Sequence, residues 1–437
     1  MKTEAPTNVK ADAPAGVPPE DAARLPDWSN TRPVADRYPG MDTSELPIEP
    51  YVSEDFFELE REKIFKKVWL YVGRAERIPK AGDYFVQVIE AVRSKKDGIA
   101  PSFIITRDQN GEVRAFYNTC MHRGTTVCWD QHESWETSHR RYFSCRFHGW
   151  VYDLDGSLKS VPDENQFFNL NKEQRGLKPV HCEVWKDFIF INVDPEPQQT
   201  LLEQIKPHAD LLVDFPFEKM RKRGIWTAEV NVNWKVAIDA FQEGYHVNTV
   251  HAATLPEAFN GPLNPNCRPT SIRLHEQGNR SITFMVSPTF EPPEVEKWVR
   301  QRGSSWYAAG GEDAGLAYPG TNPDKDPFYA FDCHGFFPNM LVDPYIGGFY
   351  GHEFWPITVN RTRWIGSINF TEPEKPSDLI THEHGKTTLR DAFREDTVTL
   401  DASQVGLESG ALETTILCDG EAAPRHLYNA VMEMVNS

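Results

Sequence analysis

Short apolar stretches alternate with polar turn residues through the first half of the chain. Three segments predict β-hairpins, because each joins apolar or alternating residues through Asp, Asn or Gly: 103–117, 150–156 and 184–193. Closely spaced strands with tight turns are typical of an all-β unit. We therefore expect a small all-β domain over residues 69–195.

Two segments before this region have other patterns. Residues 46–68 carry apolar side chains at helical spacing, with Phe56, Leu59 and Ile64 available for one face, which predicts a helical segment that packs on the second half of the chain. Residues 1–45 are rich in Pro, Ala, Asp and Glu and contain few large aliphatic side chains. Because such a composition buries too little apolar surface to offset the entropy of ordering, we expect a flexible tail.

The second half of the chain has longer apolar runs. Alternating residues over 226–232 predict a strand, and Asn233 follows as the N-cap of a predicted helix. The runs 282–286 and 364–370 indicate an antiparallel sheet, and the pattern from Leu389 onward is mainly helical. No G-x-G-x-x-G fingerprint or phosphate loop is present, so we expect no flavin or nicotinamide on this chain.

Composition narrows the functions open to these 437 residues. Apolar residues make up 39% and aromatic residues 12%, which is enough for globular cores. A net charge of −18, with 221–223 as the densest basic spot, argues against nucleic acid as a partner. No stretch reaches the roughly 20 apolar residues of a membrane span, and residues 1–6 lack the apolar core of a signal peptide. Seven scattered cysteines, an odd number, argue against a disulfide framework, so we expect a cytoplasmic protein.

Two short motifs carry the strongest chemical signal. Cys120 and His122 form a C-x-H motif, and Cys145 and His148 form a C-x2-H motif. Two thiolates and two imidazoles suit a [2Fe-2S] cluster of the Rieske type, in which two histidines replace two cysteines on one iron. A Cys2His2 zinc site uses the same residue types but pairs like with like. Here each half holds one of each, with 22 residues between the halves, which favours the cluster.

The residues around these motifs are also specific. They read C-x-H-R-G from Cys120 and C-x2-H-G-W from Cys145, and with them the chain resembles the Rieske family. The spacer between the motifs is longer than usual for that family. We expect His132 and His139 to be solvated loop residues and Cys128 to be a buried free thiol.

A second group of candidate ligands follows Asn233. His246 and His251, with Asp239 and Glu243 nearby, suit a mononuclear ferrous site with two histidines and one carboxylate. On a regular helix the two histidines would lie roughly 140° apart. If both bind one iron, the helix must be distorted or end between them, as at a π-bulge. Taken alone, the pair also fits two unrelated histidines.

The order of these motifs adds a resemblance over nearly the whole chain after the tail. A Rieske motif followed by N-W-K at 233–235 and E-x2-H-x4-H at 243–251 is similar to the catalytic alpha subunit of Rieske non-haem iron oxygenases, the aromatic-ring-hydroxylating dioxygenase family. The resemblance implies an α+β fold. It would join an all-β Rieske [2Fe-2S] domain at 69–195 to a helix-grip catalytic domain at 196–437, with an antiparallel sheet and C-terminal helices.

The resemblance also implies a ligand set for mononuclear Fe(II). His246 and His251 would be two of the ligands, and the third would come from an acidic pair on a C-terminal helix, shortly before a Gln and a Gly. That pair corresponds to Glu395 and Asp396. We favour Asp396, with Glu395 second, and expect Asp401 to be a surface residue.

One position departs from the family pattern. Glu243 stands where the family usually has an Asp that bridges a cluster histidine of the neighbouring subunit to an iron-bound histidine. We assign this bridge to Glu243, with Asp239 as the weaker candidate. Because the electron would cross between chains, neighbouring subunits should lie head to tail, and a cyclic homotrimer closes such a contact. Whether a small beta subunit joins the trimer stays open.

The implied reaction consumes O2 and hydroxylates a small aromatic substrate, by dihydroxylation, monooxygenation or demethylation. Electrons would come from a separate ferredoxin or flavin reductase. Two other interpretations stay open at this point. One is a Rieske electron carrier whose C-terminal half only binds a partner. The other is a zinc-stabilised structural protein, which would be colourless.

Overall fold

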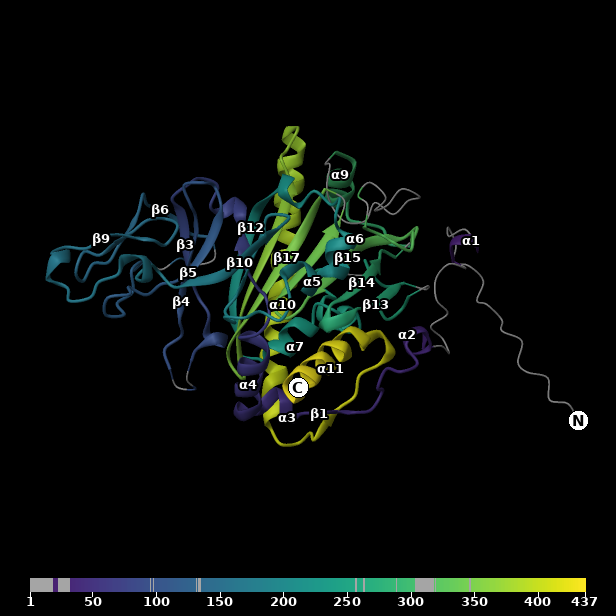
Figure 1. Cartoon of the computed structure of the whole chain (residues 1–437). Helices are drawn as coiled ribbons and strands as arrows, with labels where there is room; N and C mark the ends of the chain where they lie inside the picture. The colour runs from purple at the N-terminus through teal and green to yellow at the C-terminus, as the bar shows by residue number, and fades with distance from the viewer. Residues whose placement is uncertain are drawn as a thin grey trace, which may run out of the picture.

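The structure is a computed structural model, and it joins a small all-β domain to a larger domain built on one antiparallel sheet. In Figure 1 the small domain lies to one side of the larger sheet. The structure describes residues 19–22 and 32–437, except 95, 97, 131, 133, 134, 256, 257, 262, 263, 288, 303–317, 319 and 346.

In the described residues the small domain contains a seven-stranded sheet of order β2-β11-β10-β5-β4-β3-β6 and a three-stranded sheet β7-β8-β9. The three predicted hairpins are confirmed as the antiparallel pairs β4–β5, β8–β9 and β10–β11. Lys186 and Asp187 form the two-residue turn of the last pair, and both have the positive φ that such hairpin turns require. The strands are β2 Leu70–Arg74, β3 Asp83–Val88, β4 Ser102–Arg107, β5 Val113–Tyr117, β6 Ser138–His139, β7 Phe143–Ser144, β8 Val151–Tyr152, β9 Leu158–Ser160, β10 Pro179–Trp185 and β11 Phe188–Asn192.

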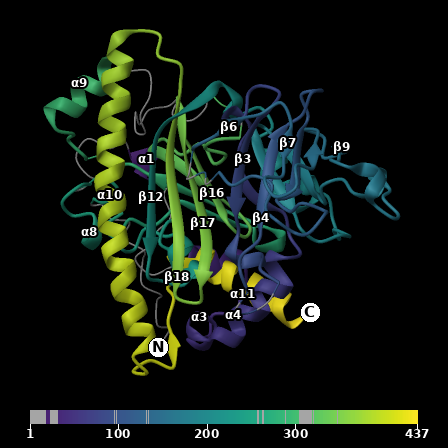
Figure 2. The same ribbon diagram turned by 90° about the vertical axis from the view of Figure 1, so that its left-hand side faces the viewer.

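The larger domain has a seven-stranded antiparallel sheet of order β12-β18-β17-β16-β15-β14-β13 among the described residues. Figure 2 shows the long helix α10 running beside β12 and β18. The predicted α+β class is confirmed, and the C-terminal helical region begins earlier than Leu389. The strands are β12 Met220–Val230, β13 Ser271–Leu274, β14 Arg280–Met285, β15 Tyr329–Phe336, β16 Met340–Tyr345, β17 Gly348–Thr358 and β18 Arg361–Thr371, and the helices are α5 Leu201–Gln204, α6 Lys206–Leu211, α7 Trp234–Asp239, α8 Val247–Val250, α9 Glu294–Arg302, α10 Pro376–Glu408 and α11 Ala422–Asn436.

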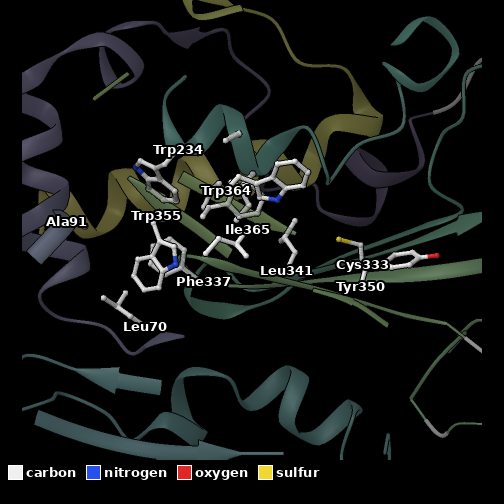
Figure 3. Close-up of a cluster of buried hydrophobic side chains, with 14 of the residues drawn as sticks. Leu70, Ala91, Trp234, Cys333, Phe337, Leu341, Tyr350, Trp355, Trp364 and Ile365 are labelled. Carbon is white, nitrogen blue, oxygen red and sulfur yellow. The ribbon is translucent and has the colours of Figure 1, made fainter. Parts of the chain in front are cut away.

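A large cluster of buried apolar side chains lies between the sheet and the helices around α7. Figure 3 shows Trp234, Trp355 and Trp364 among its members. Trp234 is fully buried, and its indole nitrogen donates to Glu60 at 3.0 Å. The same carboxylate pairs with the ammonium of Lys235, which is also buried. The N-W-K motif therefore anchors α7 to the segment that precedes the small domain.

That preceding segment is helical, as predicted, and consists of α3 Glu49–Val52, α4 Glu54–Glu60 and a π-helical turn at Arg61–Phe65. Phe56 and Ile64 are buried as expected. The expectation for Leu59 is wrong, because this side chain is 45% exposed while Phe57 is 1% exposed. The buried face runs through Phe57, Glu60, Arg61 and Ile64, so it includes two charged side chains, and a face drawn through apolar residues alone selects the wrong position.

One arginine on β2 connects the two domains. The guanidinium of Arg74 donates to the carbonyl oxygens of Met220 at 2.6 Å and Phe217 at 2.7 Å, and it pairs with Asp187 at 2.9 Å. Arg74 is 2% exposed. A buried charge held by carbonyl and carboxylate oxygens is costly to separate from its partners, so this contact fixes the small domain against the sheet.

The described part of the predicted N-terminal tail is partly packed. Helix α2 Pro33–Arg37 buries Val34, whose amide donates to Asp419 at 3.1 Å. Strand β1 Leu46–Pro47 follows and pairs with β19 Thr414–Thr415. Helix α1 Pro19–Ala22 is also described, and the rest of residues 1–31 lies outside the described residues. Among the helices that the structure describes, none has the length and apolar character needed to cross a membrane.

Candidate metal centres

The C-x-H and C-x2-H motifs form two loops of matching geometry. In each loop the amide of a glycine donates to the carbonyl of the cysteine four residues earlier, Gly124 to Cys120 at 3.0 Å and Gly149 to Cys145 at 3.0 Å. The two glycines have φ of 81° and 70°. A side chain is strained in this left-handed region, so glycine lets each loop close directly behind its ligands. Each loop thus presents one cysteine and one histidine.

The two cysteines supply a buried pair of thiols. Cys120 and Cys145 are each 2% exposed. Burial raises the pKa of the Cys120 thiol, and the neighbouring Cys145 thiol raises it further. The hydroxyl of Tyr152 lies 3.2 Å from Cys120 Sγ. Because a coordinated metal deprotonates thiols that solvent does not, this pair suits a metal cluster better than a free nucleophile.

The two histidines complete a four-residue set. The ring centroids of His122 and His148 lie 4.5 Å apart, and the Trp150 ring stacks on His122 at 4.8 Å. His122 Nδ1 is buried and has no hydrogen-bond partner among the described residues. Burial lowers the pKa of His122, and the adjacent His148 adds to the effect. A neutral imidazole with a free buried nitrogen is what a metal requires. The four residues therefore fit the cluster that the sequence predicts.

The two histidines and the cysteine of the spacer have other surroundings. The expectation that His132 is solvated is wrong: it is half-buried, its Nδ1 accepts from the Val86 amide at 3.0 Å, and its Nε2 lies 2.9 Å from Ser138 Oγ. The longer spacer thus covers the edge of the sheet and uses His132 as a structural partner. His139 is exposed, as expected. Cys128 is a buried free thiol, as predicted.

The predicted single helix after Asn233 is divided in two. Asn233 caps α7 by accepting from the Lys235 amide at 3.1 Å, but α7 ends at Asp239. The one-turn helix α8 then separates the histidines, with His246 as its N-cap residue and His251 as its C-cap residue. The helix thus ends before His251, as the angular argument requires, although no π-bulge is present there. His246 keeps helical backbone angles, whereas the backbone of His251 departs from them, with φ of −100° and ψ of 20°.

His246, His251 and Asp396 converge, with one ligand atom from each lying within 4.8 Å of the others. Asp396 Oδ1 lies 3.1 Å from His251 Nε2 and 3.8 Å from His246 Nε2. Asp396 comes from the middle of α10, 145 residues after His251. Two imidazole nitrogens and one carboxylate on one side of a point match the facial arrangement of non-haem ferrous sites, which leaves positions open for other ligands. The donor set therefore fits a mononuclear iron.

The remaining nitrogen of each histidine has its own carboxylate partner. His246 Nδ1 donates to Glu243, and His251 Nδ1 lies 2.9 Å from Glu395 Oε2. The hydroxyl of Thr254 donates to the same Glu395 oxygen at 2.6 Å. Burial alone would lower the pKa of His251, but Asp396 and Glu395 outweigh it and raise that pKa. Carboxylates in this position fix the tautomer and the orientation of a metal-bound histidine. Within the acidic pair, Asp396 faces the Nε2 atoms of both histidines, whereas Glu395 contacts Nδ1 of His251.

Two further acidic residues that the sequence brought forward have other surroundings. Asp239 is buried, which raises its pKa to about 7, and no described contact joins it to His246. Asp401 accepts from the Asn231 amide at 2.7 Å. Asp401 is half-buried rather than a free surface residue, because it holds the chain end of β12 against α10.

The three converging residues line a cavity of about 110 Å³ with a predominantly apolar wall. Glu243, His246 and Asp396 also line a second cavity, of about 460 Å³. Sequence reasoning missed two polar residues in the first wall, Asp343 on β16 and His352 on β17. An aspartate inside the apolar run 340–345 was the available signal.

Comparisons with known protein families agree with this two-part organisation. The Rieske [2Fe-2S] domain family matches residues 68–180, and the family described as ring hydroxylating alpha subunit (catalytic domain) matches residues 217–437. The second match covers half of the chain. A [2Fe-2S] domain followed by this catalytic domain agrees with the predicted pair of cofactors and disfavours the zinc interpretation.

Two relatives illustrate the range of similar proteins. The chain is 33% identical over 300 residues to the biphenyl 2,3-dioxygenase subunit alpha of Rhodococcus jostii (strain RHA1), covering 64% of this chain and 61% of that protein. It is 30% identical over 209 residues to the carnitine monooxygenase oxygenase subunit of Escherichia coli (strain K12), covering 47% of this chain and 52% of that protein. The matched stretches thus span less than two thirds of either relative.

Solved structures share the fold across nearly the whole chain. Naphthalene 1,2-dioxygenase from Rhodococcus sp., bound to indole, superposes with a TM-score of 0.69 at 21% identity, covering 90% of this chain and 94% of that one. A quaternary ammonium Rieske monooxygenase in complex with an inhibitor superposes with a TM-score of 0.67 at 20% identity, covering 89% and 95%. At these identities the likeness extends to the fold alone.

Proposed function

We propose, on the premise that this chain belongs to the family of Rieske non-haem iron oxygenase catalytic subunits, that it hydroxylates a small organic molecule with dioxygen and with electrons from a separate protein. One observation carries the proposal: His246, His251 and Asp396 converge at the wall of an apolar cavity. An electron carrier with a partner-binding C-terminal half does not require a second metal site beside an apolar cavity, so this alternative is not favoured.

In this proposal each set of residues holds one cofactor. Cys120, His122, Cys145 and His148 hold the cluster, and His246, His251 and Asp396 hold the mononuclear iron. When bound, the cluster supplies single electrons and the ferrous iron activates dioxygen. Monooxygenation consumes one O2, two electrons and two protons for each hydroxyl group and water formed, whereas dihydroxylation puts both oxygen atoms into the substrate.

The surrounding residues orient the iron ligands and exclude water. Glu395 and Thr254 fix His251 from behind, while Glu243 fixes His246, so both Nε2 atoms stay directed at Asp396. The apolar wall of the cavity holds the substrate beside the triad. A water-poor site of this kind strengthens the electrostatic interactions within it.

We assign to Glu243 the bridge between subunits. Figure 2 shows β9 of the small domain and α8 on opposite sides of the chain. Because α8 lies between His246 and His251, this separation favours electron transfer from a neighbouring chain. Glu243 lines both the substrate cavity and the larger cavity, so it borders two spaces next to the triad. One oxygen accepts from His246 Nδ1, and carboxylate oxygens retain further lone pairs for a partner's histidine. Head-to-tail contacts of this kind close as a homotrimer.

The proposal is tested on anaerobically purified protein. We expect a Rieske EPR signal, one iron more than the cluster contains, and oxygen uptake when a surrogate ferredoxin and reductase are supplied with an aromatic or amine substrate. A protein with the cluster signal but without the additional iron or any oxygen uptake would be an electron carrier. A colourless protein that contains zinc would refute both the oxygenase proposal and the electron-carrier alternative.

The bridge needs its own test. Glu243→Gln removes the charge but keeps the side-chain length, and we expect both metals to stay bound while the reduced cluster is oxidised far more slowly in the presence of substrate and O2. Asp239→Asn serves as the comparison, because it removes a buried carboxylate from the same cavity. Normal electron transfer in Glu243→Gln, or slow transfer in Asp239→Asn alone, would contradict the assignment.

A further inference from the structure

Besides Asp396 of the triad, the wall of the substrate cavity contains a second buried carboxylate. Asp343 is 5% exposed and lies on β16, where it pairs in register with Tyr350 of β17. Both residues line the same cavity as His246, His251 and Asp396. Asp343 does not contact the triad through any described interaction, so the ligand set does not account for its presence.

The neighbour of Asp343 is a neutral histidine. The indole N–H of Trp364 donates to His352 Nδ1 at 3.2 Å, and His352 Nε2 lies 3.3 Å from Asp343 Oδ2. An indole nitrogen can only donate, so Nδ1 of His352 must be the acceptor and carries no proton. The single ring proton is therefore on Nε2 and is donated to Asp343. His352 supplies a hydrogen bond to the carboxylate but no positive charge.

The second oxygen of Asp343 lacks a comparable partner. Oδ1 is buried and accepts no hydrogen bond from a nitrogen or oxygen donor of the described residues. The thiol of Cys333, a weak donor, faces the carboxylate. Within the described part of the chain, no lysine or arginine lies within 4.0 Å of either oxygen. A buried carboxylate without a cation is unfavourable unless a bound ligand compensates it.

Much of the remaining wall is aromatic. Phe241, Phe259, Phe284, Phe331 and Phe393 line the cavity together with Tyr350. Aromatic faces attract cations, most strongly where water is excluded. The volume of about 110 Å³ is smaller than the roughly 150 Å³ apolar cavity that accommodates benzene. Compact groups therefore fit beside the triad, and a positively charged nitrogen is the group that both the carboxylate and the rings favour.

We infer that the substrate is an organic cation, an amine or alkylammonium compound whose nitrogen lies against Asp343 while a neighbouring carbon faces the triad. The inference rests on the proposed function only in taking this cavity as the substrate site. Asp343 is then the residue that selects charge, and His352 is the positioning residue that holds its carboxylate toward the cavity.

Calorimetric binding to the wild-type holoprotein under anaerobic conditions tests the inference. Tert-butylamine and isopropylamine, which are compact enough for this volume, are each compared with the alcohol and the hydrocarbon of the same shape. A hydrogen bond from a charged ammonium group to Asp343 is stronger than one from a neutral hydroxyl group. We therefore expect each amine to bind roughly 10- to 100-fold more tightly than its alcohol. Equal or tighter binding of the alcohols or hydrocarbons, or no amine binding, overturns the inference.

A charge-removing variant tests the residue itself. In Asp343→Asn the preference for the amines should disappear, with the affinity for the alcohols and hydrocarbons retained. Asp332→Asn is the matched control: it removes a buried carboxylate from the adjacent strand β15, which is held by Thr283 and Asn322 outside the cavity, and it should keep the preference for amines. A preference that survives in Asp343→Asn contradicts the role of Asp343.

Failure of this inference is separable from failure of the proposed function. If neutral aromatic compounds bind and stimulate oxygen uptake while amines do not, the cation inference is wrong and the oxygenase proposal stands. If no ligand binds and no compound stimulates oxygen uptake, both are wrong. Should either variant fail to fold, the wild-type ligand series still decides the question of charge.

Discussion

The acidic pair at the centre of α10 gives a sharp test of the iron site, because its two members have different roles. Asp396 faces the Nε2 atoms of both histidines, whereas Glu395 accepts from His251 Nδ1 at 2.9 Å. We therefore expect Asp396→Asn to lose the mononuclear iron. Glu395→Gln should keep a bound iron with weakened affinity.

The magnitude for Glu395→Gln follows from what the substitution leaves in place. A glutamine oxygen still accepts from His251 and from Thr254, but the charge that strengthens these hydrogen bonds is lost. Carboxylates behind metal-bound histidines contribute about 10- to 100-fold in metal affinity, or about 1.4 to 2.8 kcal/mol. Since Glu395→Gln keeps the hydrogen bonds, we expect it to lose about 10-fold in iron affinity. Glu395→Ala removes them, and we expect it to lose about 100-fold.

The assay is competition for ferrous iron against a chelator under anaerobic conditions, followed by counting iron and sulfide per chain. The cluster signal should be unchanged in every variant and serves as an internal standard. Glu383→Gln is the matched control, because this residue lies on the same helix with a side chain that is 71% exposed. If Asp396→Asn retained iron while Glu395→Gln lost it, the assignment of the third ligand would be reversed.

Three further predictions concern other parts of the molecule. Glu60→Gln leaves the buried Lys235 ammonium without its counter-charge, so the free energy of unfolding should fall by about 3 to 5 kcal/mol, measured as a lower melting temperature. Tyr152→Phe removes the hydroxyl 3.2 Å from Cys120 Sγ, and loss of roughly 1.4 kcal/mol of thiolate stabilisation should lower the cluster potential by about 60 mV in a redox titration. Burial lowers the pKa of His334 to about 3 in the folded protein. Below the pKa of about 6.5 that this histidine has in the unfolded chain, the unfolded chain binds a proton that the folded chain does not. The free energy of unfolding therefore falls as the pH falls. At about pH 5 this histidine alone should cost about 2 kcal/mol, and His334→Gln should show a smaller drop in melting temperature between about pH 7.5 and about pH 5 than the wild type.

Local pattern was sufficient for much of the fold because short-range rules determine it. The hairpin of β10 and β11 could be predicted from alternating residues and a two-residue turn, and the N-cap of α7 from Asn233. The exposed Leu59 was not predicted, because the buried face of this segment includes the charged side chains of Glu60 and Arg61, which an apolar pattern does not reveal. His132 was misjudged for a related reason, since a polar residue in a long loop shows its partners only once the sheet edge is formed.

The candidate site depended on contacts that sequence distance hides. Cys120 and Cys145 could be paired from their motifs, but the triad joins His251 to a residue far along α10, and only the resemblance to a family brought Asp396 forward. The choice between Glu395 and Asp396 needed the direction of each side chain from the helix. Asp343 was overlooked because an aspartate in a strand is ordinarily a surface residue. It lines the cavity only once β16 is paired with β17 in the sheet.

The position of Glu243 relates the two centres to the break in the helix. Because α7 ends at Asp239 and α8 begins after His246, the connection between them is free of regular helical bonds and can bring Glu243 back onto His246. The second Glu243 oxygen accepts from the amides of Tyr245 and His246 in the same connection. These contacts stabilise the turn that presents His246, and Tyr245 in the same turn is 63% exposed.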